Sequence, residues 1–243
     1  NGIGDLVDSI YSPFDQDITI TPATGKTFPK NTLDLSQLNA LPEVQRSSWV
    51  IEENVLLRCG DQQGVATMKG VEAQYLEMSR LKDFLFDGSI SLEGTTGPTA
   101  ILGIALKTDL AVPLDDGVFQ PLEISAPIRG RKLSKYQQRA FEQSSLAVSG
   151  TYTMNMEFDA KYAVVPLEFA QEVLHYDSSV SALEVQLKNS KDMDRVAKKL
   201  RADLGPSFIV KTRYQKNALM YQTNASEKLF TFIILVFIGL IGA

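Results

Sequence analysis

The hydrophobic pattern of the chain is densest at its end. Residues 229–243 (LFTFIILVFIGLIGA) contain no charged side chain and reach the last residue of the sequence. A helix that spans a bilayer needs roughly 20 apolar residues, so this run has the character of such a helix but not its full length. We therefore expect residues 214–243 to form one long helix that enters a membrane. A helix buried in a protein core is the less favoured alternative.

Upstream of this run the pattern alternates between helical and strand-like spacing. Apolar residues at helical spacing predict helices over residues 5–14, 32–41, 72–81, 99–112, 166–174 and 193–204. Alternating or β-branched runs predict strands over residues 17–21, 48–57, 64–71, 118–128, 145–158, 182–187 and 208–212. The clearest unit is the strand–helix–strand arrangement of residues 182–212.

The order of these elements indicates an α+β fold. A β-α-β arrangement near each end is typical of a split ferredoxin-like domain, and the glycine-rich, polar stretch from Lys82 to Gly97 indicates a subdomain border. A mostly β insertion would then lie in the middle of the chain. The predicted parts are residues 1–85, 86–165, 166–213 and 214–243, the last being the connecting helix and the start of a transmembrane helix.

Composition excludes some classes of protein. The net charge is −5, and nucleic-acid binding proteins usually carry a basic surface, so we expect no nucleic-acid partner. Cys59 is the only cysteine, which excludes a disulfide-stapled secreted scaffold. The first residues have no basic and apolar leader pattern. We expect the chain to be an excerpt from a longer membrane protein.

Thr24–Thr27 (TGKT) resembles the end of a phosphate-binding loop. That loop needs a further glycine where this chain has Ile20, and a helix that begins at the lysine, which Phe28-Pro29 prevents. A turn with a solvated Lys26 is the favoured interpretation.

Other candidate residues favour structural roles. His175, the only histidine, stands at a predicted helix end and is expected to cap it. The carboxylate pairs Glu52-Glu53 and Asp115-Asp116 are expected to be solvated surface charges, and Trp49 to lie in the core. These patterns predict no enzyme active site, no metal site and no cofactor in this chain.

A basic segment is more informative in so acidic a chain. It contains Arg129, Arg131, Lys132, Lys135 and Arg139, with Tyr136 and Phe141 alongside, and it lies between two predicted strands. A hairpin loop of about fifteen residues is longer than a turn requires. It is either a docking arm for an acidic partner, since arginine and tyrosine are enriched at interfaces, or a solvated loop.

Residues 214–228 (YQKNALMYQTNASEK) contain neither proline nor glycine. This favours a rigid rod into the membrane over a simple tether.

Several stretches together resemble lipoprotein-releasing ABC transporter permeases of the LolC/LolE type, in particular bacteroidete-like members. They are Asn1-Gly2 with LVDSIYSPFDQDITITPATGKTF, residues 53–57 (ENVLL), 69–71 (KGV), 148–152 (VSGTY), 159–167, and 217–228 followed by the apolar run. The resemblance extends along the whole chain and depends on distributed patterns, not on one catalytic motif.

The resemblance implies a MacB-like periplasmic core domain between the first two of four membrane helices. It would have a membrane-proximal Porter-like part and a distal, inserted Sabre-like part. It implies a bacterial inner-membrane protein with residues of about 1–228 in the periplasm. The implied partners are a cytoplasmic ABC ATPase that binds and hydrolyses ATP, a second permease copy or paralogue, the lipoprotein cargo and a periplasmic lipoprotein carrier. By position, Pro127 to Phe141 corresponds to the hook that binds the carrier.

Two other functions stay open. One is a related permease ectodomain, either of a MacB-type efflux pump or of an FtsX-like activator of cell-wall hydrolases. The other is a membrane-anchored binding domain with no role in transport.

Overall fold

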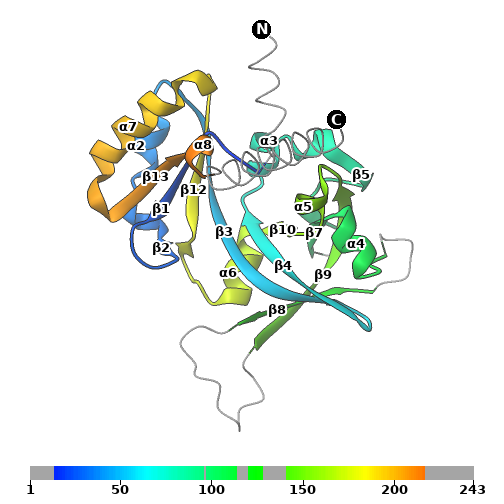
Figure 1. Ribbon diagram of the computed structural model, residues 1–243. Helices are drawn as coiled ribbons and strands as arrows, with labels where there is room; N and C mark the ends of the chain where they lie inside the picture. The colour runs from blue at the N-terminus through cyan, green and yellow to red at the C-terminus, as the bar shows by residue number, and fades with distance from the viewer. Residues whose placement is uncertain (1–13, 96, 114–119, 128–140, 217–243) are drawn as a thin grey trace, which may run out of the picture.

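The computed structural model describes residues 14–95, 97–113, 120–127 and 141–216 (Figure 1). The strands are β1 (Ile18–Pro22), β2 (Phe28–Pro29), β3 (Val44–Cys59), β4 (Gln62–Val71), β5 (Leu85–Gly88), β6 (Glu93–Gly94), β7 (Gly97–Gly103), β8 (Leu122–Pro127), β9 (Phe141–Tyr152), β10 (Tyr162–Pro166), β11 (Ser179–Val180), β12 (Ala182–Leu187) and β13 (Phe208–Thr212). The helices are α2 (Leu35–Asn39), α3 (Tyr75–Met78), α4 (Ile104–Asp109), α5 (Met156–Asp159), α6 (Leu167–Leu174), α7 (Met193–Leu204) and α8 (Arg213–Lys216). Single turns of 3-10 helix span Lys30–Thr32, Leu81–Phe84, Ser190–Asp192 and Gly205–Ser207.

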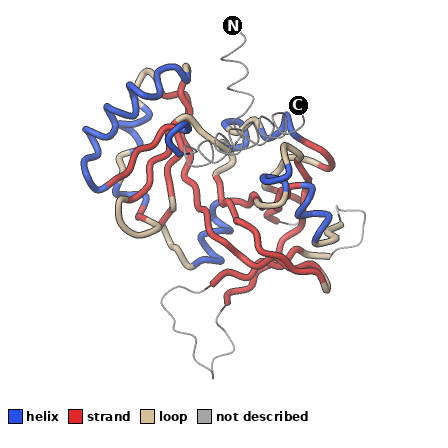
Figure 2. The backbone as a smooth tube through the Cα atoms, viewed as in Figure 1, coloured by secondary structure: helices blue, strands red, loops and turns tan. Residues whose placement is uncertain are grey.

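The fold is mixed and rich in β-sheet. In the described part of the chain, hydrogen-bonded strands follow the order β13-β1-β12-β3-β4-β10-β7-β9-β5, with β8 paired to both β3 and β9. Figure 2 shows the long β3–β4 hairpin running through the middle of the molecule, with helices around its outside. These two strands connect the two halves of the fold.

One half is built from β1, β3, β12 and β13. Each neighbouring pair in the order β13-β1-β12-β3 is antiparallel. The connection from β1 to β3 contains α2, that from β12 to β13 contains α7, and each passes over a strand that lies between its two ends. Figure 1 shows α2 and α7 on the same outer side of these strands. The predicted strands 182–187 and 208–212 and the predicted helix 193–204 have these bounds in the structure.

The other half closes on itself. β3 pairs with β4, β4 with β10, β10 with β7, β7 with β9, β9 with β8, and β8 again with β3. A closed sheet leaves few free edges and encloses side chains. Its apolar residues include Leu57, Met68, Leu102 and Ile124, all fully buried. Since β3 belongs to both halves, the division of the chain at residues 86 and 165 stays a prediction.

The two faces of the sheet around β3 and β4 are covered differently. One face packs on α6 and belongs to the larger apolar cluster, which also includes Ile18, Trp49 and Leu183. Gly70 lies on this face, where an added Cβ would collide with the Cβ of Ala170 on α6, so only glycine allows the helix so close. The opposite face packs on α3 and a second cluster that contains Phe14, Tyr75 and Tyr152.

Three predicted elements differ from the structure. Residues 99–112, predicted as one helix, are the end of β7 followed by α4. A continuous apolar run cannot be assigned to strand or helix by periodicity alone, and Ala100–Leu102 are fully buried between β10 and β9. The predicted strand 145–158 ends at Tyr152 and is followed by α5, and the predicted helix 72–81 is reduced to the single turn α3.

The predicted helix 5–14 lies outside the described residues apart from Phe14, and so does residue 217 onward, with the predicted membrane segment. In the part that the structure describes, no helix combines the length and the apolar character that crossing a bilayer requires.

Candidate functional site

The predicted hook begins and ends on a well-formed hairpin. β8 and β9 pair antiparallel from Leu122 with Leu146 to Pro127 with Phe141. Pro127 and Phe141 are therefore paired with each other at the last described position of this ladder. Arg129, Arg131, Lys132, Lys135, Tyr136 and Arg139 lie outside the described residues, so their role in a docking arm stays a prediction.

A second site, which the sequence analysis missed, is a group of charged side chains on the α3-covered face of the sheet. We call Lys69, Glu52, Glu184 and Lys216 the charge cluster. The Nζ of fully buried Lys69 lies 2.6 Å from Oε1 of Glu52 and 2.9 Å from Oε1 of Glu184. The Nζ of Lys216 lies 3.5 Å from the same Glu184 oxygen. Four elements, β3, β4, β12 and α8, thus bring two cations and two anions together.

Three members of this cluster have shifted pKa values, and in each case the neighbouring charges favour the ionised form. Burial would lower the pKa of Lys69, but Glu184 and Glu52 outweigh it and keep that pKa well above its usual range. Burial would raise the pKa of Glu52, but Lys69 and Lys216 lower it to about 2. The pKa of Lys216 is raised, since Glu184 and Glu52 outweigh its burial. A buried charge is tolerated only with such compensation.

Aromatic rings lie beside Lys69, the most buried member of the cluster. The Nζ of Lys69 lies 5.1 Å from the ring centre of Tyr75 and 5.9 Å from that of Phe14, within the range of cation–π attraction. Phe14 also contacts Tyr152 and Tyr162, with ring centres 5.5 and 5.0 Å away. The rings exclude water around Lys69 and so strengthen its ion pairs.

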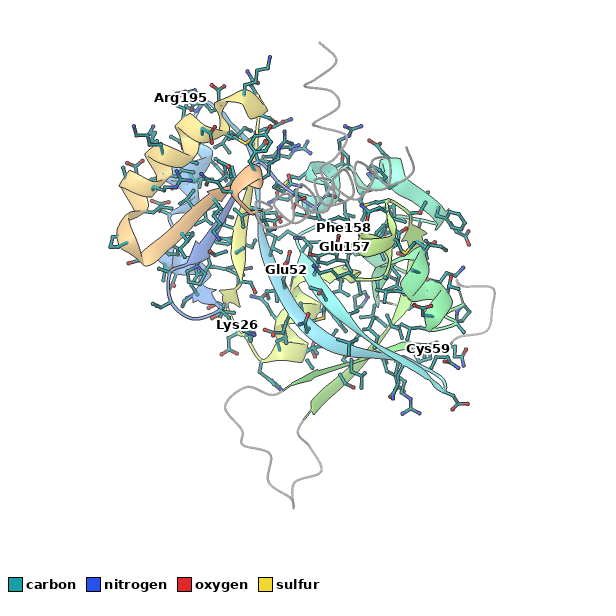
Figure 3. All side chains as sticks on the ribbon, viewed as in Figure 1. Lys26, Glu52, Cys59, Glu157, Phe158 and Arg195 are labelled. Atoms are coloured by element: carbon teal, nitrogen blue, oxygen red, sulfur yellow. The ribbon has the colours of Figure 1, made fainter. Side chains whose placement is uncertain are left out.

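An open groove of about 570 Å³ adjoins the cluster, lined in part by Glu52, Glu53, Lys26 and Lys161. Figure 3 shows Lys26 and Glu52 on the same side of the molecule. Lys26 is an exposed turn residue, as expected, and its Nζ lies 3.3 Å from Glu53. The expectation that Glu52 and Glu53 are solvated is wrong, because Glu52 pairs with buried Lys69 and Glu53 accepts a hydrogen bond of 3.0 Å from Tyr176.

The remaining candidates have structural roles. Trp49 is buried in the larger cluster, as predicted. His175 is the C-cap residue of α6, with φ of 52°, which confirms the expected position. Cys59 is a buried free thiol. Among the described residues, no three His, Cys, Asp or Glu side chains are grouped so that they could hold a metal ion. Asp115-Asp116 lies outside those residues.

The short helix α8 is fixed by polar contacts at its start. Gln215 N donates to Oγ1 of Thr212 at 3.4 Å, and Oε1 of Gln215 accepts from Thr212 N at 3.2 Å, which is a capping box. The same Gln215 oxygen accepts from Arg201 of α7 at 2.6 Å, and Arg213 N donates to the carbonyl of Asp17. These contacts tie α8 to β13, α7 and the chain before β1.

The comparison with protein families matches residues 1–203 to the MacB-like periplasmic core domain. The chain belongs to that family. It is thus a periplasmic domain of an ABC-type transporter permease.

Among solved structures, the chain resembles the periplasmic region of MacB from Actinobacillus actinomycetemcomitans, with a TM-score of 0.54, 13% identity and coverage of 84% of this chain and 92% of that one. It also resembles the extracellular domain of the noncanonic ABC-type transporter YknZ from Gram-positive bacteria, with a TM-score of 0.51, 13% identity and coverage of 80% and 99%. At this identity the likeness concerns the fold. A comparison with curated proteins finds no match.

In this MacB-like periplasmic core domain, the sequence contains only a weak indication of the charge cluster. Lys69 is the only charged residue in the run from Val65 to Val71, whereas Glu184 stands at a polar position of the alternating strand from Ala182 to Leu187. A charge within a predicted buried strand needs a partner of opposite sign, so Lys69 could have been flagged, whereas alternation predicts that Glu184 faces solvent.

Proposed function

We propose that this domain belongs to a lipoprotein-releasing permease and passes lipoproteins from the inner membrane to a periplasmic carrier. The observation that supports this most is the β8–β9 hairpin, paired out to Pro127 and Phe141, which leads into a loop with five basic residues in a chain of net charge −5. An acidic or polar carrier surface would complement such a loop. Pro127, Arg129, Arg131, Lys132, Lys135, Tyr136, Arg139 and Phe141 would form the docking hook.

The proposal includes a division of the fold. The strand order β13-β1-β12-β3, with α2 and α7 as crossovers, supports a split ferredoxin-like, Porter-like part from residues 1–85 and 166–213. Residues 86–165 would be the Sabre-like insertion. Residues 214–243 would connect to, and begin, a transmembrane helix, with residues of about 1–228 in the periplasm.

The proposal also assigns partners. ATP would bind and be hydrolysed on a separate cytoplasmic ATPase, and this chain would perform no catalysis and hold no cofactor. A second permease copy or a paralogue would complete the transporter. The lipoprotein cargo and the carrier would meet the domain on the periplasmic side.

The test is co-elution of the 243-residue chain in detergent with the periplasmic lipoprotein carrier of the same organism. We expect a complex that weakens as salt is raised, because charge attraction is screened. The variant Arg129→Glu/Arg131→Glu should lose it, whereas the matched control Lys198→Glu/Lys199→Glu, on an exposed part of α7, should keep it. Carrier binding that is unchanged in the Arg129→Glu/Arg131→Glu variant would contradict the docking role.

The fold likeness to the MacB periplasmic region favours one second candidate, a MacB-type efflux permease. That protein would dock an adaptor in place of the carrier. A folded wild-type chain that never binds the carrier but binds such an adaptor would support this second candidate and overturn the first.

A further inference from the structure

The charge cluster is balanced only when α8 is in place. Lys69 compensates one of the two carboxylates, Glu52 and Glu184, which leaves one negative charge on β3 and β12. Lys216, from α8, supplies the fourth charge through its contact with Glu184. Lys161 and Asp15 add one weaker charge of each sign, acting on Glu52 and Lys216 respectively, and so do not change the balance.

Glu184 is the member most dependent on this contact. Its side chain is only 1% exposed, and its second oxygen, Oε2, is buried with no hydrogen-bond partner among the described residues. A buried carboxylate with an unsatisfied oxygen is costly unless cations neutralise it. Lys69 and Lys216 are those cations, both on Oε1.

Lys216 can move away from Glu184 more easily than Lys69 can. Lys69 is fully buried on β4, which is paired on both sides, whereas the side chain of Lys216 is 30% exposed and stands at the end of a four-residue helix. The start of that helix is fixed by Thr212, Gln215 and Arg201. The last residue of α8 is Lys216 itself. Among the described residues, its side chain is bonded to the sheet through Glu184.

We propose that Lys216 and Glu184 form an electrostatic latch that holds the end of α8 against the sheet. Release of the latch exposes an unbalanced carboxylate, so the position of α8 depends on the charge of residue 184. The latch is a conformational device, and it does not depend on the proposed role in lipoprotein transfer.

The test is amide hydrogen exchange across residues 208–216 of the full 243-residue chain in detergent, for wild type and three variants. Wild type is neutral at the cluster, Lys216→Gln is −1, Glu184→Gln is +1, and the double variant Glu184→Gln/Lys216→Gln is neutral again. Exchange reports local opening of the helix. Lys198→Gln on α7 is the matched control for loss of one lysine.

We expect α8 amides to exchange at least about tenfold faster in Lys216→Gln than in wild type or in Lys198→Gln, while β3 and β4 amides keep their protection. In the double variant the acceleration should be no larger than in either single variant, because one shared contact is lost in all three. Equal exchange in Lys216→Gln and wild type would overturn the latch. A double variant whose acceleration equals the product of the two single effects would also overturn it.

Discussion

The two faces of the sheet around β3 and β4 are stabilised in different ways, although residues that are neighbours in sequence contribute to both faces. Met68 and Leu183 point into the apolar cluster beneath α6, whereas their neighbours Lys69 and Glu184 form ion pairs on the opposite face. All four side chains are at most 1% exposed. Burial alone stabilises the first pair, since apolar area leaves water at roughly 25 cal/mol per Å². The second pair is tolerated only because opposite charges meet.

A buried polar face therefore depends on the pairing of its members in a way that an apolar face does not. An apolar cluster that loses one group keeps the contacts among the others. A charge cluster that loses one member leaves an uncompensated charge in a water-poor place. The same property makes the charged face the one through which α8 can be controlled.

The largest effect among the charged residues is expected at Lys69. Lys69→Met should lower the free energy of unfolding by about 3–5 kcal/mol, the usual cost of breaking a buried ion pair from one side. Adding Glu184→Gln restores the balance between Glu52 and Lys216, and should recover at least about half of the loss. Urea unfolding at neutral pH measures both variants, with Lys198→Met as the control for loss of an exposed lysine. A double variant less stable than Lys69→Met would show that charge balance is not what stabilises this face.

The smallest effect is expected at the exposed rim of the groove. Lys26 pairs with Glu53, but its side chain is 71% exposed, so Lys26→Met should change the free energy of unfolding by no more than about 1 kcal/mol. Thermal unfolding of Lys26→Met beside wild type measures this. A loss as large as that of Lys69→Met would mean that the groove, and not the buried cluster, carries the electrostatic contribution.

The sequence predicted the parts of this fold where local pattern and tertiary packing agree. The bounds of β12, α7 and β13 were predicted correctly. In β13 the alternation, and in α7 the helical stripe, each match one buried face. β12 also alternates in sequence, although both of its faces are buried. β7 was missed because Ala100–Leu102 are buried on both sides, and a uniformly apolar run has no period.

The candidate sites divide in the same way. The basic hook is local in sequence and could be predicted, although it lies outside the described residues and stays a prediction. The charge cluster could not be assembled from the sequence, since Lys69 meets partners 17 and 115 residues away. Only the pairing of β3, β4 and β12 in one sheet brings those residues together.

The central claim is that charge stabilises one face of the sheet and apolar burial the other, and the pH dependence of stability tests it most directly. The pKa of Glu52 falls from 4.5 to about 2 on folding. A lowered pKa contributes stability that is fully present above pH 4.5 and is lost as the pH falls toward 2. The measurement is the free energy of unfolding from pH 7 to pH 2 for wild type, Glu52→Gln and Leu183→Ala.

The gap between wild type and Glu52→Gln should be constant above about pH 5 and should close as the pH falls from 4.5 toward 2. Leu183→Ala should lie about 2–5 kcal/mol below wild type at every pH, because a cavity in an apolar core does not titrate. Two variants whose curves run parallel to wild type over the whole range would contradict the account.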